Sequence, residues 1–273
     1  MLNKIDLEVI VAIAKDAGDA IMEIYDKDFQ IDYKDDKSPL TEADTKSNEI
    51  ICEALEKAYP EIPLLSEENK AEVYEVRKNW EYFWLIDPID GTKEFIKKNG
   101  EFTVNIALIH KDTPVLGVVY APALKDMYKA KKGEGAFKNG QKLPLEVNET
   151  PEKSLRVVAS KSHLSEETQA FIDVVAKATE NIEQVSKGSS LKLVMVAEGS
   201  ADIYPRLAPT MEWDTGAADA VVREAGKMTY QYNSTFNIVP SGNALGVQHS
   251  ILEDPLIYNK KDLLNPWFIV KGM

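Results

Sequence analysis

The chain has 273 residues and a formal net charge of −13, with 44% hydrophobic and 28% charged residues. This length allows one large α/β domain or two smaller lobes with an ample core. The acidic composition argues against nucleic-acid binding, which needs a basic surface to neutralise phosphates. A small anionic substrate is compatible with it, because a metal ion or a local group of lysines and arginines can reverse the charge at one site.

A single cysteine, Cys52, excludes an internal disulfide, and the three scattered histidines argue against a zinc cluster. Acids and lysines interrupt the apolar N-terminal stretch, so we expect no signal peptide. The sequence has no uninterrupted run of 18 apolar residues, and we therefore expect no membrane span. These features predict a cytoplasmic protein, monomeric or homodimeric, and leave peripheral attachment to the inner membrane open.

The first half of the chain begins with an amphipathic helix predicted over residues 4–26, where apolar residues recur at helical spacing. A polar strand and loop lead to a second predicted helix over residues 41–59. A short strand is predicted at 62–66, a buried strand at 82–86, and further strands at 102–110 and 114–122. A hairpin meander is predicted over 126–145, with Asn139-Gly140 as its turn signal.

The second half of the chain alternates strands with helices. Strands are predicted at 156–160, 182–185 and 201–207, and helices at 165–180, 188–199 and 213–226. This alternation is typical of an open α/β layer. We therefore predict an α/β fold of the layered α+β kind, with an antiparallel N-terminal sheet and a smaller C-terminal α/β sheet. A boundary near residue 153 would divide one catalytic unit into lobes of residues 1–153 and 154–273.

The stretch WLIDPIDGTKEF, residues 84–95, places two aspartates three residues apart at the end of a predicted buried strand. Partly buried carboxylates this close repel each other, so they either face water or share a cation. The proline and glycine of this stretch permit a turn on which Asp87, Asp90 and the carbonyl of Ile89 converge. Such oxygen ligands suit Mg²⁺ or Mn²⁺, and the backbone N–H groups that follow could bind an anion.

Other acids also lie where predicted elements meet, and each has a simple structural explanation. Asp44 follows Thr41 by three residues and could complete a helix capping box. Asp214 could be an acid at a helix N-terminus, where the helix dipole favours it. Glu67 and Glu68 could form a solvated turn. A metal site requires several of these acids together.

The motif DPIDGTKEF, the SEE upstream of it and EWDTGAADAVVREAG downstream resemble the inositol monophosphatase superfamily of Mg²⁺-dependent, lithium-sensitive phosphatases. The longer string DPIDGTKEFIKKNGEFTVNIALI, with SKSH and GSSLKLVMVAEGSADIYPR, is closer to the bacterial 3′(2′),5′-bisphosphate nucleotidase branch, the CysQ type. The resemblance covers nearly the whole chain. It implies an αβαβα sandwich and hydrolysis of 3′-phosphoadenosine 5′-phosphate (PAP) to AMP and phosphate, a reaction of sulfur metabolism. Whether the 5′-phosphosulfate PAPS is also a substrate stays open.

The resemblance also implies roles for the matching residues. The metal ligands would be Glu67, Asp87, the carbonyl of Ile89, Asp90 and Asp214. They would hold two or three Mg²⁺ ions, which Mn²⁺ could replace and Li⁺ would inhibit. Asp44 and Thr92 would orient and deprotonate the attacking water. Substrate contacts would come from Gly91, Thr92, Ser160, His163, Gly188, Ser189, Lys192 and Asp214.

Several alternatives stay open. An ordinary helix start with a surface lysine would also explain GSSLK, and His163 could be a surface residue. Lys227 stands where the family usually has a second glycine, and WDTGAADA replaces the common WDTAAG; we expect both to alter helix packing only. An inositol monophosphatase or a sugar-bisphosphate phosphatase would use the same chemistry, although TKEF and GSSLK favour the nucleotidase. A further alternative is a non-catalytic nucleotide or metal sensor, which would share the fold but not the catalytic activity.

Overall fold

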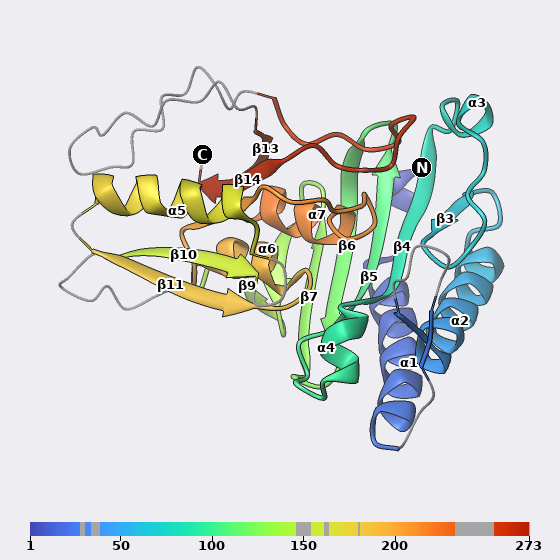
Figure 1. Ribbon diagram of the computed structural model, residues 1–273. Helices are drawn as coiled ribbons and strands as arrows, with labels where there is room; N and C mark the ends of the chain where they lie inside the picture. The colour runs from blue at the N-terminus through green and yellow to red at the C-terminus, as the bar shows by residue number, and fades with distance from the viewer. Residues whose placement is uncertain are drawn as a thin grey trace.

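The structure is a computed structural model, and it describes residues 1–27, 31–33, 39–145, 154–160, 164–179, 181–232 and 254–272. Its elements stack in five layers: a helix pair, a large sheet, a second helix pair, a smaller sheet and a single helix (Figure 1). This order confirms the predicted αβαβα sandwich. Within the described residues, no helix is both long and apolar enough to cross a membrane.

Among the described residues, the larger sheet has seven strands. In spatial order they are β3 (Leu64–Ser66), β4 (Tyr82–Asp90), β5 (Thr103–His110), β6 (Thr113–Ala121), β7 (Asp126–Lys131), β8 (Gly135–Lys138) and β9 (Gln141–Lys142). Strands β4 to β9 pair antiparallel, which confirms the predicted antiparallel sheet, whereas β3 runs parallel to β4. The central strands are nearly continuous apolar runs because helices pack against both of their faces.

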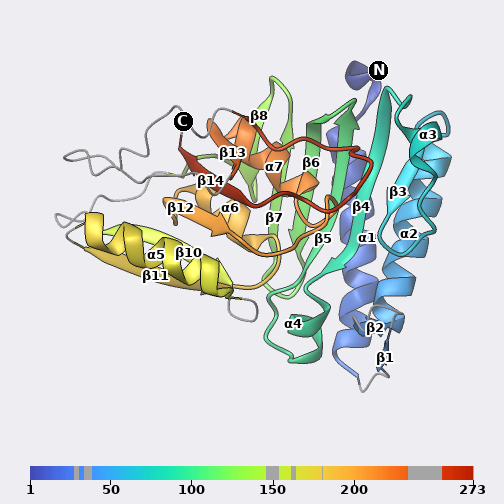
Figure 2. The same ribbon diagram turned by 45° about the horizontal axis from the view of Figure 1, so that its top comes forward.

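Two long helices cover one face of this sheet, α1 (Leu7–Tyr25) and α2 (Glu42–Ala58) (Figure 2). A 3₁₀ turn, η1 (Leu2–Lys4), precedes α1. A two-stranded ribbon, β1 (Ile31–Tyr33) with β2 (Pro39–Thr41), leads into α2. The predicted capping box is present at the start of α2, since the Asp44 carboxylate accepts the N–H of Thr41.

The second helix pair, α6 (Leu191–Glu198) and α7 (Gly216–Glu224), lies between the two sheets, with α7 against the other face of the larger sheet and α6 in contact with the smaller one. Helix α7 approaches β6 closely at Gly117. A Cβ at this position would lie 2.1 Å from the backbone oxygen of Ala217 and 2.8 Å from the Cβ of Ala220. Only glycine therefore permits this contact, which fixes the start of α7 relative to the sheet.

In the part of the chain that the structure describes, the smaller sheet has five strands in the spatial order β11 (Ile182–Lys187), β10 (Leu155–Ser160), β12 (Ile203–Arg206), β14 (Phe268–Gly272) and β13 (Lys227–Gln231). Strand β10 runs parallel to both of its neighbours, and β14 runs antiparallel to both of its own. Helix α5 (Glu166–Ala178) contributes apolar side chains to a core shared with this sheet.

Some elements differ from the sequence predictions. Strands β13 and β14 and the short helix α3 (Tyr74–Arg77) were not predicted, because each is at most five residues long and depends on tertiary contacts. Helix α7 begins at Gly216, three residues later than predicted, so Asp214 lies in the turn before the helix. The division of the chain near residue 153 stays a prediction, and one apolar cluster combines residues from both sheets.

Candidate active site

A pocket of about 260 Å³ lies where the ends of several strands and the starts of several helices meet. The end of β3 contributes Glu67, and the end of β4 contributes Asp87 and Asp90. The start of α4 (Thr92–Ile96), the turn before α6 and the turn before α7 complete this side of the pocket. Segments that are distant in sequence therefore line one cavity.

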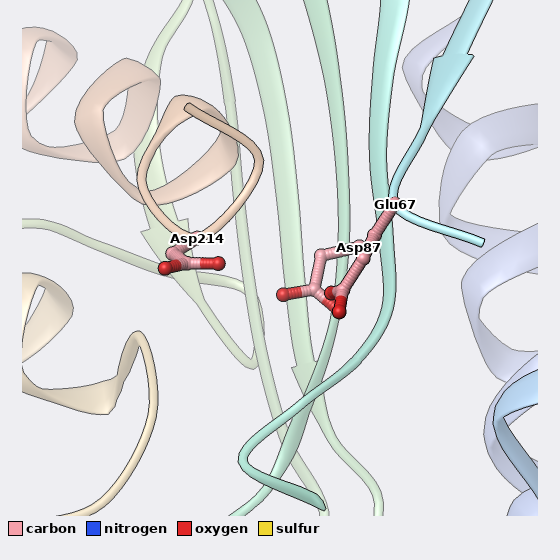
Figure 3. A group of neighbouring side chains, drawn as sticks. All are labelled: Glu67, Asp87 and Asp214. Atoms are coloured by element: carbon pink, nitrogen blue, oxygen red, sulfur yellow. The ribbon is translucent and has the colours of Figure 1, made fainter. Parts of the chain in front are cut away.

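Three acidic side chains converge at this pocket (Figure 3). Carboxylate oxygens of Glu67, Asp87 and Asp214 all lie within 4.8 Å of one another. The N–H of Glu67 donates to the carbonyl of Ile86 at 3.1 Å, so pairing with β4 places Glu67 beside Asp87. The carboxylate of Asp214 accepts the N–H of Met211 at 2.9 Å, which orients it within the turn before α7.

The electrostatics of this cluster fit a bound cation. Burial raises the pKa of Asp87 well above its ordinary value, and nearby Glu67 and Asp90 raise it further. Burial and the neighbouring Asp90 raise the pKa of Asp214 to about 8. These carboxyls resist ionisation because they are buried beside other acids. A divalent cation would supply the positive charge that favours their ionised forms, and an all-oxygen donor set suits Mg²⁺ or Mn²⁺.

Asp90 lies beside this cluster and hydrogen-bonds a residue 100 positions away. Its Oδ2 accepts the N–H of Ser190 at 2.5 Å and the hydroxyl of Ser190 at 2.6 Å. Burial raises the pKa of Asp90, while Lys192 and Ser190 oppose this shift. The contact with Ser190 was not predicted, because a serine in GSSLK carries no sequence signal for a partner so far away.

Asp44 and Thr92 form the hydrogen-bonded pair on which the predicted water-orienting role depends. The hydroxyl of Thr92, the first residue of α4, donates to Oδ1 of Asp44 at 3.2 Å. The other carboxylate oxygen, Oδ2, accepts the N–H of Thr41 at 2.8 Å and its hydroxyl at 2.6 Å. Asp44 can therefore serve both as a helix cap and as the partner of Thr92, because one carboxylate oxygen caps α2 and the other accepts from Thr92.

The predicted turn between the two aspartates is instead part of β4. The strand continues to Asp90, and its register with β5 shifts between Asp87 and Asp90, as in a β-bulge. Bulges redirect side chains without ending a strand. The N–H of Ile89 donates to Oδ1 of Asp87 at 3.1 Å. The chain leaves the strand at Gly91, whose φ of +94° is in the left-handed region that favours glycine.

Basic and aromatic side chains also line this pocket. Lys192 is only 6% exposed, and burial lowers its pKa to about 8. Arg206, at the end of β12, lines the same pocket, as do Tyr204 and Phe268. No role was predicted for these last three residues. The arginine of IYPR was a visible signal for an anion site, whereas the two aromatic residues are typical of any buried strand.

The remaining predicted substrate contacts have different outcomes. Gly188 and Ser189 line the pocket, but the N–H of Gly188 donates to the carboxylate of Glu101 at 2.9 Å. That N–H is therefore engaged by an acid within the protein. His163 and the side chain of Ser160 lie outside the described residues. All four assignments stay predictions.

Comparisons with known proteins identify the family. The family model described as "Inositol monophosphatase family" matches residues 4–264, and the chain belongs to this family. It is 45% identical over 228 residues to a 3′(2′),5′-bisphosphate nucleotidase CysQ from Salmonella typhimurium, covering 83% of this chain and 90% of that protein. The protein of the same name from Escherichia coli K12 is 42% identical over 228 residues, with the same coverage.

A solved structure supports the same family assignment. The crystal structure of CysQ from Bacteroides thetaiotaomicron, described as a bacterial member of the inositol monophosphatase family, is 42% identical in sequence. The two structures align with a TM-score of 0.82, covering 97% of this chain and 96% of that one. The family and the branch predicted from the sequence motifs are confirmed.

Proposed function

We propose that this chain is a Mg²⁺-dependent 3′(2′),5′-bisphosphate nucleotidase that hydrolyses PAP to AMP and phosphate, with PAPS as a further candidate substrate. The supporting observation is the convergence, at one pocket, of three acids within 4.8 Å and a group of basic residues. An acidic cluster of this kind suits metal-assisted hydrolysis, and basic residues beside it suit a substrate with a second anionic group. The CysQ proteins that the chain resembles carry the nucleotidase name.

The metal ligands would be Glu67, Asp87, Asp90, Asp214 and the carbonyl of Ile89. They would hold two or three Mg²⁺ ions, with Mn²⁺ as a substitute and Li⁺ as an inhibitor that occupies one position. When bound, such ions lower the pKa of a coordinated water and neutralise charge on the leaving oxygen. The protein's part is to fix these oxygens from three separate elements in advance of substrate binding.

Thr92 and Asp44 would handle the proton of the attacking water. The Thr92 hydroxyl donates its proton toward Asp44, so its lone pairs are left to accept a hydrogen bond from water. This arrangement aims the water and draws its proton toward a buried carboxylate. The backbone N–H groups of Gly91 and Thr92 would hold oxygens of the phosphate that is removed.

Lys192 and Arg206 would recognise the phosphate that is retained. Both line the pocket that contains the acids, and Lys192 is held in a buried position on α6. A monophosphate of inositol offers no second phosphate for these cations, whereas PAP does. Charged hydrogen bonds of this kind contribute about 1.5–3 kcal/mol each. This difference favours the nucleotidase over an inositol monophosphatase. A sugar-bisphosphate phosphatase is the second candidate, because it also has a second phosphate to bind.

The test is phosphate release from PAP, PAPS, fructose 1,6-bisphosphate and inositol 1-phosphate, each with Mg²⁺ and with EDTA. We expect Mg²⁺-dependent release, with the highest kcat/KM for PAP. A preference for the sugar bisphosphate would support the second candidate. Binding of PAP without release from any substrate would instead indicate a nucleotide sensor. The cytoplasmic location and the monomeric or dimeric state stay predictions.

A further inference from the structure

The Ser190 hydroxyl lies where three distant segments of the chain meet. It is 2.6 Å from Oδ2 of Asp90 at the end of β4, and 2.6 Å from the backbone oxygen of Asp214 before α7. It also accepts a hydrogen bond from Nδ2 of Asn105 on β5, at 2.9 Å. Ser190 itself precedes α6 and is 1% exposed. One buried hydroxyl therefore connects two of the acids of the proposed metal centre.

The donors around Asp90 fix which way its carboxylate turns. Oδ2 receives the N–H of Ser190 and lies 2.6 Å from its hydroxyl oxygen, and the Asn105 side chain also donates to this carboxyl. Because Asn105 Nδ2 can only donate, the single hydroxyl proton of Ser190 is directed at Asp90 or at the Asp214 carbonyl. Oδ2 is thus engaged by Ser190, and these contacts fix how the Asp90 carboxylate faces the pocket.

Two features show that the surrounding structure is arranged around this contact. Ser189 has a φ of +47°, an unusual left-handed conformation for a residue other than glycine. This conformation turns the chain so that both donors of Ser190 reach Asp90. In addition, Oδ1 of Asn105 is buried and has no hydrogen-bond partner among the described residues. The amide contributes its donor groups to Ser190 and to Asp90.

We propose that Ser190, supported by Asn105, is a positioning residue that orients Asp90 toward the bound cation and couples this orientation to Asp214. The inference rests on the proposed metal centre and goes beyond it, because Ser190 touches neither substrate nor metal in this account. Hydrogen-bond partners that orient metal ligands typically contribute a factor of about 10–100 in metal affinity. The loss on removing the hydroxyl should therefore appear first in cation binding.

The experiment measures Mn²⁺ binding to the substrate-free protein by electron paramagnetic resonance and calorimetry. Ser190→Ala keeps the backbone N–H but removes the hydroxyl, and we expect its Mn²⁺ affinity to fall about 10–100-fold. Asn105→Ala should weaken binding in the same direction, and Ser190→Thr, which keeps the hydroxyl, should bind nearly as tightly as wild type. In steady-state kinetics, Ser190→Ala should raise the Mg²⁺ concentration for half-maximal activity more than it raises the KM of substrate.

Ser165→Ala is the matched control. Ser165 is a half-buried serine that, like the buried Ser190, makes several hydrogen bonds, but it lies at the start of α5 and outside the pocket lining. Its removal should change stability but leave Mn²⁺ affinity unchanged. Equal Mn²⁺ affinity in Ser190→Ala and wild type, tighter binding in Ser190→Ala, or an equal loss in Ser165→Ala would overturn the positioning role alone. A wild-type protein that binds no Mn²⁺ would overturn the metal-dependent function as well.

Discussion

The Thr92 hydroxyl donates to one oxygen of the Asp44 carboxylate, while the other oxygen of the same carboxylate caps helix α2 through Thr41. Asp44 is 2% exposed, so its geometry is set by these contacts and not by solvent. The Asp44 side chain thus both stabilises the start of α2 and positions Thr92, the residue proposed to orient the attacking water. The two effects can be separated by experiment.

Asp44→Asn should separate the capping of α2 from the role of Asp44 beside Thr92. The amide oxygen can still accept the Thr41 N–H, so we expect the free energy of unfolding to stay within about 1 kcal/mol of wild type. The amide NH₂ would then face Thr92 and donate to its hydroxyl oxygen, which reverses the hydrogen bond and removes the acceptor for the proton. We expect kcat to fall by about 10²–10⁴. Glu42→Gln, an exposed change in the same helical turn, is the control and should leave kcat unchanged.

Lys192→Met should reduce the preference for bisphosphates. Methionine replaces the buried lysine stem without its charge, so packing on α6 is largely kept. We expect kcat/KM for PAP to fall about 10–100-fold, in line with the loss of a charged hydrogen bond, and kcat/KM for a monophosphate to fall less, through the lost effect of Lys192 on Asp90 alone. Lys177→Met, on the exposed end of α5, should alter neither value. An equal loss on both substrates would remove Lys192 from the second phosphate site.

The raised pKa values in the acidic cluster predict that cations and pH together determine the free energy of unfolding. The pKa of Asp214 rises from 3.8 to about 8 in the folded, cation-free protein, so the fold retains a proton that the unfolded chain releases. The stability that this proton contributes is fully present below the ordinary pKa of 3.8. It is lost as pH rises through the folded-state pKa of about 8. Asp87 and Asp90, with raised pKa values, act in the same direction.

Thermal unfolding with EDTA and with excess Mg²⁺ should reveal this coupling. We expect Mg²⁺ to raise Tm more at about pH 8.5 than at about pH 5, because protons compete with the cation for the same carboxylates at low pH. In Asp214→Asn, the increase in Tm caused by Mg²⁺ should differ less between the two pH values than in the wild-type protein. A Mg²⁺ effect that is independent of pH in the wild-type protein would contradict the electrostatic description of the cluster.

Gly117→Ala tests the packing that positions Asp214. The new methyl group would collide with the backbone oxygen of Ala217 on α7. We expect a loss of about 1–3 kcal/mol or more in the free energy of unfolding, measured in urea, together with weaker Mn²⁺ binding. Gly272→Ala is the control, since a Cβ there would lie 3.6 Å from Nζ of Lys227, an ordinary contact. A fully stable Gly117→Ala protein would show that α7 can shift without cost.

The fold class and the acids of the site could be predicted well from the sequence for physical reasons. Apolar runs in β4, β5 and β6 and helical spacing in α1 are strong local patterns. Acids placed directly after such runs, as Asp87 and Glu67 are, can be recognised from the order of residues alone. The pairing of Asp44 with Thr92 also followed from the family motif.

The contacts that depend on how layers stack could not be predicted. The partner of Asp90 is Ser190, 100 residues later at the start of α6, and no local pattern connects them. Arg206 and Phe268 reach the pocket only because β12 and β14 pair in the smaller sheet. The bulge in β4 also escaped prediction, since proline and glycine beside two aspartates equally suggest a turn. These features arise from tertiary structure, which single-sequence patterns do not encode.

The most direct test of the central claim is the product formed from PAP in the presence of Mg²⁺, followed by ³¹P nuclear magnetic resonance. We predict that wild-type protein converts PAP to AMP and inorganic phosphate, that EDTA stops the reaction, and that Asp90→Asn is folded but inactive. Failure to release phosphate from PAP, or release of the 5′-phosphate to leave adenosine 3′-phosphate, would contradict the proposed nucleotidase function.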